Sequence, residues 1–307
     1  MATQEVLLRH RIIIQMLRSN PAGFSEIEEK LRLESELNEL NFDISLRTFQ
    51  RDIKDILYVY GIEIKFDRTQ KVYKIVNDDH DPYTERLFEG LDIFQVLKQK
   101  HAFSKYFQFD TRKPQGNEHL AGLLHAIQNR FQIRFYYRKF NAEHSERRII
   151  EPYLLKEFRL RWYVFGYDID RKSFRIFGLD RIDSLSISDI RFQNPQQIDP
   201  KRYFQNSFGI IGPDGKKPEK IILEFTNSQG NYVRTLPIHE SQRILSDENG
   251  IMKIQLKLIP TYDFIIELLS FGEFVRVLAP DSLAEKVRNR LIQAANLYEL
   301  SNEKKKN

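Results

Sequence analysis

Apolar positions recur at helical spacing in three segments within the first 60 residues of the chain. The first segment begins near residue 4 and stops before an Asn-Pro pair, which cannot continue a helix. The second begins near Ser25, and Glu28 follows it at the spacing of a capping box. The third begins at Ser45, a residue suited to the N-cap, and ends at Gly61. We therefore expect three helices in this region.

The third helical segment is followed by two alternating runs, residues 62–66 and 71–75, on either side of a polar turn at 67–70. Alternation of apolar and polar residues around such a turn predicts a β-hairpin. Three helices and a hairpin indicate a winged helix-turn-helix domain over residues 1–76. Its third helix should bury the apolar side made by Leu46, Phe49, Ile53, Ile56 and Tyr60.

A polar break follows this domain, and we place a helical linker at residues 77–125. The linker contains a helix near 83–101, a loop near 113–116 and a short helix that starts near 118. Residues 126–195 then hold five short strands, near 131–139, 147–155, 160–168, 173–180 and 184–192. That density of strands favours a small β-barrel over alternating strands and helices.

A second linker, residues 196–217, ends in a stretch rich in Gly and Pro. Residues 218–303 carry strands near 219–226, 250–259 and 274–278, with helical stretches near 228–236, 261–271 and 281–299. We expect a small C-terminal α+β domain there and a frayed tail at residues 304–307. The predicted fold class is α+β, in three modules.

The composition narrows the class of protein. The chain has 307 residues, enough for two or three domains. It has no cysteine, which excludes disulfides, iron–sulfur clusters and thiolate zinc sites. The sequence has no apolar run of the roughly 18 residues that a membrane span needs, and its first helix mixes charged with apolar residues, unlike a secretory signal. We expect a cytoplasmic protein that does not contact membranes.

An enzyme is the first alternative function, but no catalytic motif supports it. The histidines are scattered without metal-ligand spacing. The glycines of residues 209–215 lack the spacing of a P-loop and the Ser or Thr after its Lys. His144 lies with Glu143 and Glu146 in a polar turn, where solvated side chains are common. We expect no catalytic residue, no cofactor and no metal site.

Positive charge is concentrated in the middle of the chain. Residues 1–76 contain twelve Lys/Arg and twelve Asp/Glu, whereas residues 126–181 contain thirteen Lys/Arg and seven Asp/Glu. The excess in the second range is mostly arginine interleaved with aromatic residues, which favours an anionic partner. Solvated surfaces also carry such charges, so the excess by itself identifies no ligand.

Polar side chains with hydrogen-bond donors share the face of the third helix opposite its apolar side. Arginine can read guanine edges and glutamine adenine edges, while a helix N-terminus favours phosphate. Cations on the hairpin would contact the adjacent DNA backbone as a wing. The candidate DNA contacts are Ser45, Arg47, Thr48, Gln50, Arg51 and Lys54 on the helix and Lys65, Arg68 and Lys71 on the hairpin.

The alternative for this helix is an ordinary solvent-exposed surface. The domain has no net charge, and Asp52 and Asp55 lie on the same helix as the proposed contacts. The connection before the helix is also longer than a tight turn. If the domain reads DNA, its affinity should depend on local placement of charge and on doubling of the site in a dimer.

The run Arg161-Trp162-Tyr163-Val164 carries a second signal. Alternate residues of a strand share a face, so Arg161 and Tyr163 line up, as do Arg175 and Arg181 on the next strand. Arginines and aromatic rings on one sheet face can hold an oligonucleotide or a phosphorylated ligand. The alternative is that Trp162, Tyr163 and Phe177 fill the barrel core while the arginines form surface ion pairs. The residue types leave both interpretations open.

This block resembles the WYL family of bacterial regulators, named for a Trp-Tyr-Leu run that reads Trp162-Tyr163-Val164 here. The similarity extends to residues 135–138, 148–153 and 174–182. Residues 45–53 are similar to the family's recognition helix, and residues 274–280 to its C-terminal extension. The resemblance covers nearly the whole chain, and the order of the three modules is more specific than any one motif.

The resemblance implies a transcriptional regulator, commonly dimeric, whose barrel senses a nucleic-acid or nucleotide-like ligand. It implies a winged helix-turn-helix, then an Sm-like (SH3-like) β-barrel, then a small C-terminal α/β sandwich of ferredoxin-like form. The ligand contacts it implies are Tyr137, Arg148, Tyr163, Arg175 and Arg181, to which strand phase adds Arg161. Trp162 has the opposite phase and is expected in the core.

The expected partners are a double-stranded DNA operator, a single-stranded nucleic acid or nucleotide, and a second copy of the chain. An Sm-type protein that binds single-stranded DNA or RNA without operator specificity is the second alternative. The N-terminal domain argues against that as the only function.

Overall fold

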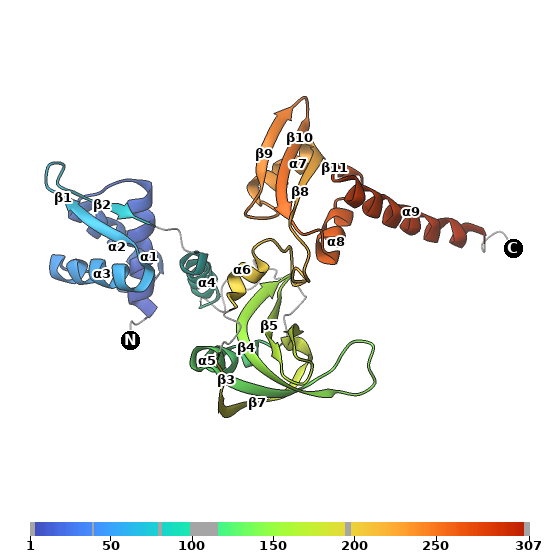
Figure 1. Ribbon diagram of the computed structural model, residues 1–307. Coiled ribbons are helices and arrows are strands. Elements are labelled where there is room, and N and C mark those ends of the chain that lie inside the picture. Colours follow the sequence, from blue (N-terminus) through green and yellow to red (C-terminus); the bar gives the residue numbers. More distant parts are fainter. Residues whose placement is uncertain (1–3, 39, 79–81, 99–115, 194–197, 304–307) are drawn as a thin grey trace. The chain divides into compact units, whose positions relative to one another are not determined.

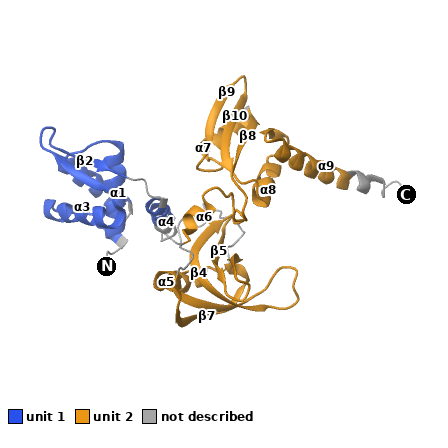
Figure 2. Ribbon diagram, in the orientation of Figure 1, with its two compact units in different colours: residues 1–109 blue, residues 110–307 orange. Residues whose placement is uncertain are grey.

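The computed structural model describes residues 4–38, 40–78, 82–98, 116–193 and 198–303 (Figure 1). The chain divides into two compact units, residues 1–109 and 110–307 (Figure 2). Parts of both predicted linkers, at 79–81, 99–115 and 196–197, the last two residues of the predicted barrel domain, 194–195, and the predicted tail at 304–307 lie outside the described residues.

Unit 1 contains three helices followed by a hairpin and a fourth helix. These are α1 (Gln4–Ser19), α2 (Phe24–Asn38), α3 (Leu46–Tyr60), β1 (Glu63–Asp67), β2 (Val72–Asn77) and α4 (Pro82–Lys98). The two strands pair antiparallel, and Ala22 forms an isolated bridge with Tyr73 of β2. The core is apolar, and Ile13, Ile27 and Phe49 have no exposed surface. The predicted winged helix-turn-helix arrangement is confirmed.

The ends of α3 follow from local chemistry. The Ser45 hydroxyl accepts a hydrogen bond from the Thr48 amide at 3.2 Å, so it caps the helix. Gly61 ends the helix at φ 70°, a conformation that glycine adopts without steric cost, and its amide donates to the Leu57 carbonyl at 3.0 Å. Leu46 was predicted to be buried, but at the first position of the helix it is 45% exposed.

The predicted capping box of the second helix is wrong. α2 begins at Phe24, so Ser25 lies inside the first turn instead of before it. The Glu26 carboxylate accepts a hydrogen bond from the Gly23 amide at 2.6 Å, which satisfies a donor at the start of the helix. The cap is therefore shifted two residues toward the N-terminus.

The first part of unit 2 is a five-stranded antiparallel sheet. Its strands are β3 (Phe131–Tyr137), β4 (Glu146–Phe158), β5 (Arg161–Asp168), β6 (Ser173–Gly178) and β7 (Ile182–Arg191), in the order β6-β5-β4-β3-β7. The last strand returns to pair with the first, as in Sm-like barrels, and α5 (Leu120–Asn129) contacts β4 and β3. The strand predicted at 173–180 stops at Gly178 because Leu179–Arg181 form a 3-10 turn, η3.

The second part of unit 2 has the predicted ferredoxin-like form. It consists of β8 (Glu219–Thr226), α7 (Asn227–Thr235), β9 (Arg243–Glu248), β10 (Ile251–Leu258), α8 (Tyr262–Ser270), β11 (Val275–Ala279) and α9 (Asp281–Glu303). The strand order is β11-β8-β10-β9, around a core that includes Leu223, Phe225 and Phe264. The prediction missed β9 and the short α6 (Pro200–Phe204). Within the described residues, no helix has the length and hydropathy of a membrane span.

Candidate nucleic-acid and ligand sites

The outer face of α3 presents the polar side chains that the sequence analysis selected. Phe49 and Ile56 anchor the opposite face without any exposed surface. Arg47, Gln50, Arg51 and Lys54 are exposed, Thr48 is half-buried, and all five line one hollow in the surface. In the described part of the chain, no carboxylate forms an ion pair with Arg47, Arg51 or Lys54. We call these five residues the recognition surface.

Asp52 lies on the same helix as the recognition surface, as the sequence shows, but is not part of that surface. It has no exposed area, and its carboxylate accepts two hydrogen bonds from Arg9, one from Nε at 2.8 Å and one from Nη2 at 2.9 Å. Burial opposes its charge, but the nearby His10 ring and the Arg9 guanidinium outweigh burial and lower the pKa of Asp52. The negative charge of Asp52, which would oppose binding of DNA to this helix, is thus neutralised by Arg9 inside the domain.

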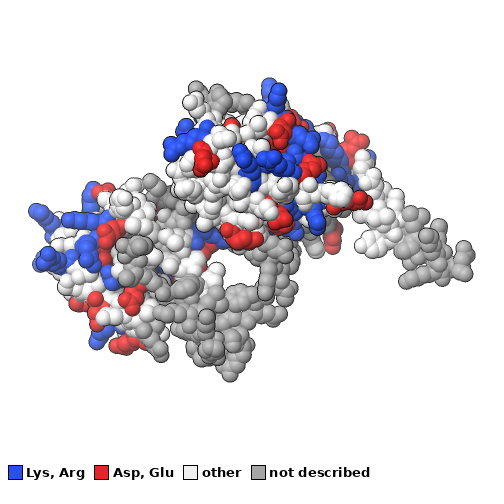
Figure 3. Space-filling view, turned by 90° about the horizontal axis from the view of Figure 1, so that it is seen from below, with Lys and Arg blue, Asp and Glu red and all other residues white. Residues whose placement is uncertain are grey.

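The other predicted DNA contacts are arranged less uniformly. The Ser45 hydroxyl is occupied by the helix cap and lies 3.1 Å from the Thr48 hydroxyl. On the hairpin, Lys65 pairs with Glu63 at 2.7 Å, whereas Arg68 and Lys71 are exposed. On the face shown in Figure 3, Lys and Arg side chains gather at one end of unit 1, and those of unit 2 are mixed with Asp and Glu.

The barrel brings three of its six predicted ligand contacts together. Tyr137, Arg148 and Arg175 line one hollow, with Lys139, Ile176 and Phe177. Arg148 is only 4% exposed; its Nη1 lies 3.3 Å from the buried Asp168 carboxylate, and its Nη2 contacts Glu146. Arg175 is exposed and its Nε is 4.0 Å from the same Asp168 carboxylate. We call this place the barrel hollow.

Arg181 contacts Tyr137, which lines the barrel hollow. Its guanidinium carbon is 5.1 Å from the centre of the Tyr137 ring and 4.5 Å from that of Phe140, within the range of cation–π contacts. Phe140 is 71% exposed, and the sequence analysis did not select it. The only signal for it was an aromatic residue in the polar turn after β3. The η3 turn, and not an extended strand, brings Arg181 here, so the strand-phase grouping with Arg175 is wrong.

Tyr163 and Arg161 do not line the barrel hollow. Tyr163 is 8% exposed, and burial raises the pKa of its hydroxyl. The Arg161 Nη1 lies 3.0 Å from the Asp180 carboxylate in a half-exposed ion pair, as the alternative interpretation of the arginines expected. Trp162 packs against the barrel core, partly buried.

Tyr137 contacts both the barrel hollow and the neighbouring Arg181. Its hydroxyl accepts a hydrogen bond from the Gly178 amide at 3.3 Å, and its ring contacts Phe177 edge-on at 5.0 Å. Burial raises the pKa of this hydroxyl, so it stays protonated and can still donate to a ligand. The chemistry available here is recognition of an anion by guanidinium groups and of a planar group by aromatic rings.

Comparison with known proteins identifies two domains. Residues 118–187 match the WYL domain and residues 217–295 match the WCX domain. The chain is 38% identical to Protein PafB of Mycobacterium tuberculosis over 181 residues, 57% of this chain and 53% of that protein, and Protein PafB of Mycobacterium bovis gives the same values. The match thus spans about half the length of these curated relatives.

Two solved structures are also similar. Proteasome accessory factor B/C (PafBC) of Arthrobacter aurescens is 20% identical, with a TM-score of 0.38, over 96% of this chain and 47% of that one. A CRISPR Cas-related protein is 14% identical, with a TM-score of 0.38, over 88% of this chain and 78% of that one.

Proposed function

Because the chain belongs to the family of WYL-domain proteins and has a WCX domain after its WYL domain, we propose that it is a DNA-binding transcriptional regulator. Unit 1 binds an operator in duplex DNA. The observation that carries this proposal is the recognition surface, where Arg47, Arg51 and Lys54 project from a capped helix whose buried Asp52 is neutralised by Arg9. Exposed cations that have no carboxylate partner among the described residues, together with a glutamine on the same helix face, suit phosphates and base edges.

Within this proposal, α3 enters the major groove and the β1–β2 hairpin contacts the neighbouring backbone. Arg47, Gln50, Arg51 and Lys54 make the main contacts, and Ser45, Thr48, Lys65, Arg68 and Lys71 support them. The protein acts as a homodimer on two half-sites, which compensates for the low net charge of residues 1–76.

The barrel hollow is the sensing site in this proposal, and its ligand is a single-stranded nucleic acid or a nucleotide. Arg148, Arg175 and Arg181 contact phosphate, and the rings of Tyr137 and Phe140 contact a base. Arg161 and Tyr163 support the site from the neighbouring strand. Ligand binding changes the affinity of unit 1 for its operator, and couplings of this kind are typically worth about 1–3 kcal/mol.

The proposal is tested with the full chain and a random duplex library. Bound duplexes are selected, sequenced and compared with single strands of the same sequence, at low and at physiological salt. We expect a pseudo-palindromic duplex to be enriched and to bind more tightly than either strand. If only the single strands bind, the chain is an Sm-type single-strand-binding protein, and the regulator proposal fails.

A further inference from the structure

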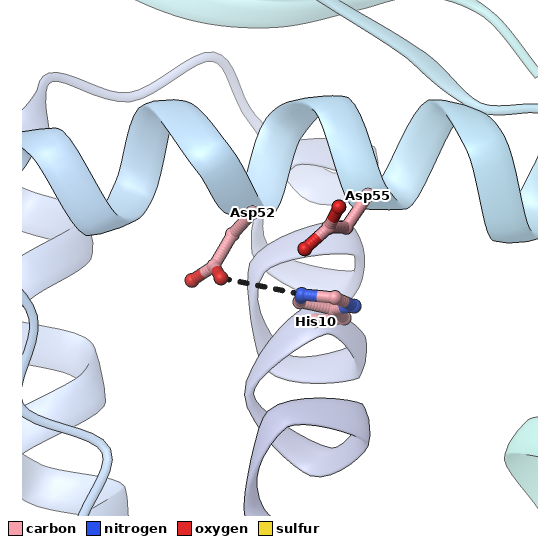
Figure 4. Close-up of side chains that lie close together, drawn as sticks. All are labelled: His10, Asp52 and Asp55. Atoms are coloured by element: carbon pink, nitrogen blue, oxygen red, sulfur yellow. Dashed lines mark ion pairs between the residues drawn. The ribbon is translucent and has the colours of Figure 1, made fainter. Parts of the chain in front are cut away.

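A cluster of ionisable side chains lies between α1 and α3, behind the recognition surface. Arg9 and His10 come from α1, Asp52 and Asp55 from α3. His10 is 1% exposed and Asp52 is fully buried, while Asp55 is half-buried. Figure 4 shows the His10 ring pointing toward α3, with Asp52 on one side and Asp55 on the other.

The partners of this cluster are incomplete. The Arg9 guanidinium donates two hydrogen bonds to the Asp52 carboxylate, so these two opposite charges balance. That leaves Asp55 beside a histidine whose Nδ1 and Nε2 are both buried and have no hydrogen-bond partner among the described residues. A buried polar group without a hydrogen-bond partner is costly. Asp55 forms no ion pair with a Lys or Arg among the described residues, so its carboxylate and the His10 ring nitrogens are together available to a cation.

The spacing of the donor atoms indicates which cation fits. The His10 Nε2 lies 3.4 Å from an Asp52 carboxylate oxygen, longer than the roughly 2.7–2.9 Å of a charge-assisted hydrogen bond. Two ligands about 2.0–2.1 Å from a tetrahedral zinc ion lie about 3.3 Å apart. One ligand atom from each of His10, Asp52 and Asp55 lies within 4.8 Å of the others. A small movement of these side chains would bring all three onto one ion.

We propose that His10, Asp52 and Asp55 bind a divalent transition-metal ion of the Zn²⁺ class between α1 and α3. Imidazole and carboxylate are ligands that Zn²⁺ accepts, and each carboxylate oxygen has more than one lone pair. The oxygen of Asp52 that accepts from Arg9 Nη2 can therefore also bind the ion. An open fourth position takes water or hydroxide, and hydroxide also offsets the excess positive charge that the ion brings beside Arg9.

The site would join the first helix to the recognition helix. Asp52 and Asp55 each follow a residue of the recognition surface in sequence, Arg51 and Lys54. An ion bound to both aspartates and to His10 would hold α3 against α1 and reduce movement of those two cations. The spacing of residues along the chain does not indicate this site, because His10 is more than 40 positions away from both aspartates and only the fold brings them together.

The test uses full-length protein that has been dialysed against a chelator. It is titrated with Zn²⁺ and, for spectroscopy, with Co²⁺, and bound metal is measured by mass spectrometry after desalting. We expect one equivalent to be retained, with Co²⁺ giving a visible absorption band. His10→Gln should lower the affinity by at least about 10-fold, because even outer-shell partners of metal ligands have effects of that size.

Two further variants keep the test decisive. Asp55→Asn alters a half-buried ligand and should weaken binding without unfolding the domain, which circular dichroism checks. His144→Gln removes an exposed histidine in unit 2 and should leave the retained equivalent unchanged. The proposal is overturned if native protein retains no more metal than His10→Gln. It is also overturned if the difference in stability between native protein and His10→Gln varies with pH but does not change when Zn²⁺ is added.

Discussion

The recognition surface and the barrel hollow are both rich in cations, but they hold them differently. On α3, Arg47, Arg51 and Lys54 are exposed and have no carboxylate partner within the described residues. In the barrel, Arg148 is buried between Glu146 and Asp168. A free surface cation attracts phosphate over a long distance, with an affinity that falls as salt rises. An arginine that is already paired binds an anion only if the new contacts replace the old ones.

This difference suits two roles. In the proposed function, the recognition surface meets any duplex and then selects sequence by base contacts, while the barrel hollow binds only anions that can replace its carboxylates. Glu146 shows the competition in the barrel, because a hydrogen bond from Lys139 and the nearby charge of Arg148 lower the pKa of its carboxyl. A ligand must displace this carboxylate or share its arginine.

Removal of the internal partner of Asp52 should have the largest effect. Arg9→Ala leaves a buried carboxylate without a counter-charge, and we expect the free energy of unfolding of unit 1 to fall by about 3–5 kcal/mol. Arg11→Ala is the control, because its partly exposed pair with Asp92 should be worth about 1 kcal/mol or less. Denaturant unfolding monitored in unit 1 measures both. Equal losses of stability in the two variants would mean that the Arg9–Asp52 pair does not hold the Asp52 charge inside the domain and away from the recognition surface.

Duplex binding should depend on single cations of the recognition surface. Arg51→Ala should weaken operator affinity by about 1–3 kcal/mol, roughly 5- to 150-fold, and should reduce the salt dependence. Arg32→Ala removes an exposed arginine of α2 outside this surface and should change affinity little. Fluorescence anisotropy at several salt concentrations measures both variants. An effect of Arg32→Ala as large as that of Arg51→Ala would place the DNA elsewhere on unit 1.

Ligand binding in the barrel should depend on Arg181 more than on Arg161. Arg181 contacts Tyr137 and Phe140, whereas Arg161 is held by Asp180 in a half-exposed pair. Arg181→Ala should weaken binding of a labelled single-stranded oligonucleotide about 10-fold or more, because a hydrogen bond to a charged group is worth about 1.5–3 kcal/mol, and should leave duplex binding intact. Arg161→Ala should have a smaller effect. The reverse order would remove Phe140 and Arg181 from the site.

The smallest effect concerns a lysine of β4 outside both sites. Burial lowers the pKa of Lys156, whose amino group lies 5.2 Å from the centre of the Phe204 ring. Its pKa is thus lower in the folded than in the unfolded chain, so native stability at this group rises with pH up to the unfolded pKa of about 10.4. Lys156→Met should stabilise unit 2 at pH 7, and the gain should shrink toward pH 10.

Thermal unfolding of native protein and Lys156→Met from pH 7 to pH 10 measures this difference. Lys220→Met, which replaces an exposed lysine of β8, should change stability by no more than about 0.5 kcal/mol at any of these pH values. A gain for Lys156→Met that does not vary with pH would mean that packing, and not the buried charge, causes it.

The sequence predicted those elements whose signals are local. α3 has its cap, its apolar period and its terminal glycine within one short segment, and both ends were predicted correctly. β9 was missed because it lies at the edge of its sheet and its residues are mostly exposed, so neither face shows an apolar pattern. The η3 turn was missed because Leu179 is buried and continues the alternation of β6.

The partners of the candidate sites were harder to predict, because they come from distant positions. The sequence does not show that Asp52 is buried and paired with Arg9. It also does not show that Arg148 is buried and paired with Asp168. Residue type and spacing therefore selected most of the cations that line the two candidate sites, but not Lys139 in the barrel hollow. They did not show which of those cations are free.

In the proposed function, a ligand in the barrel changes the affinity of unit 1 for DNA. The most direct measurement is the affinity of the full chain for its selected operator duplex with and without a saturating short single-stranded oligonucleotide. We predict a change of roughly 5- to 150-fold in native protein and none in Arg181→Ala, which should still bind the duplex. An operator affinity that is the same with and without the oligonucleotide, although the oligonucleotide binds, would contradict the account.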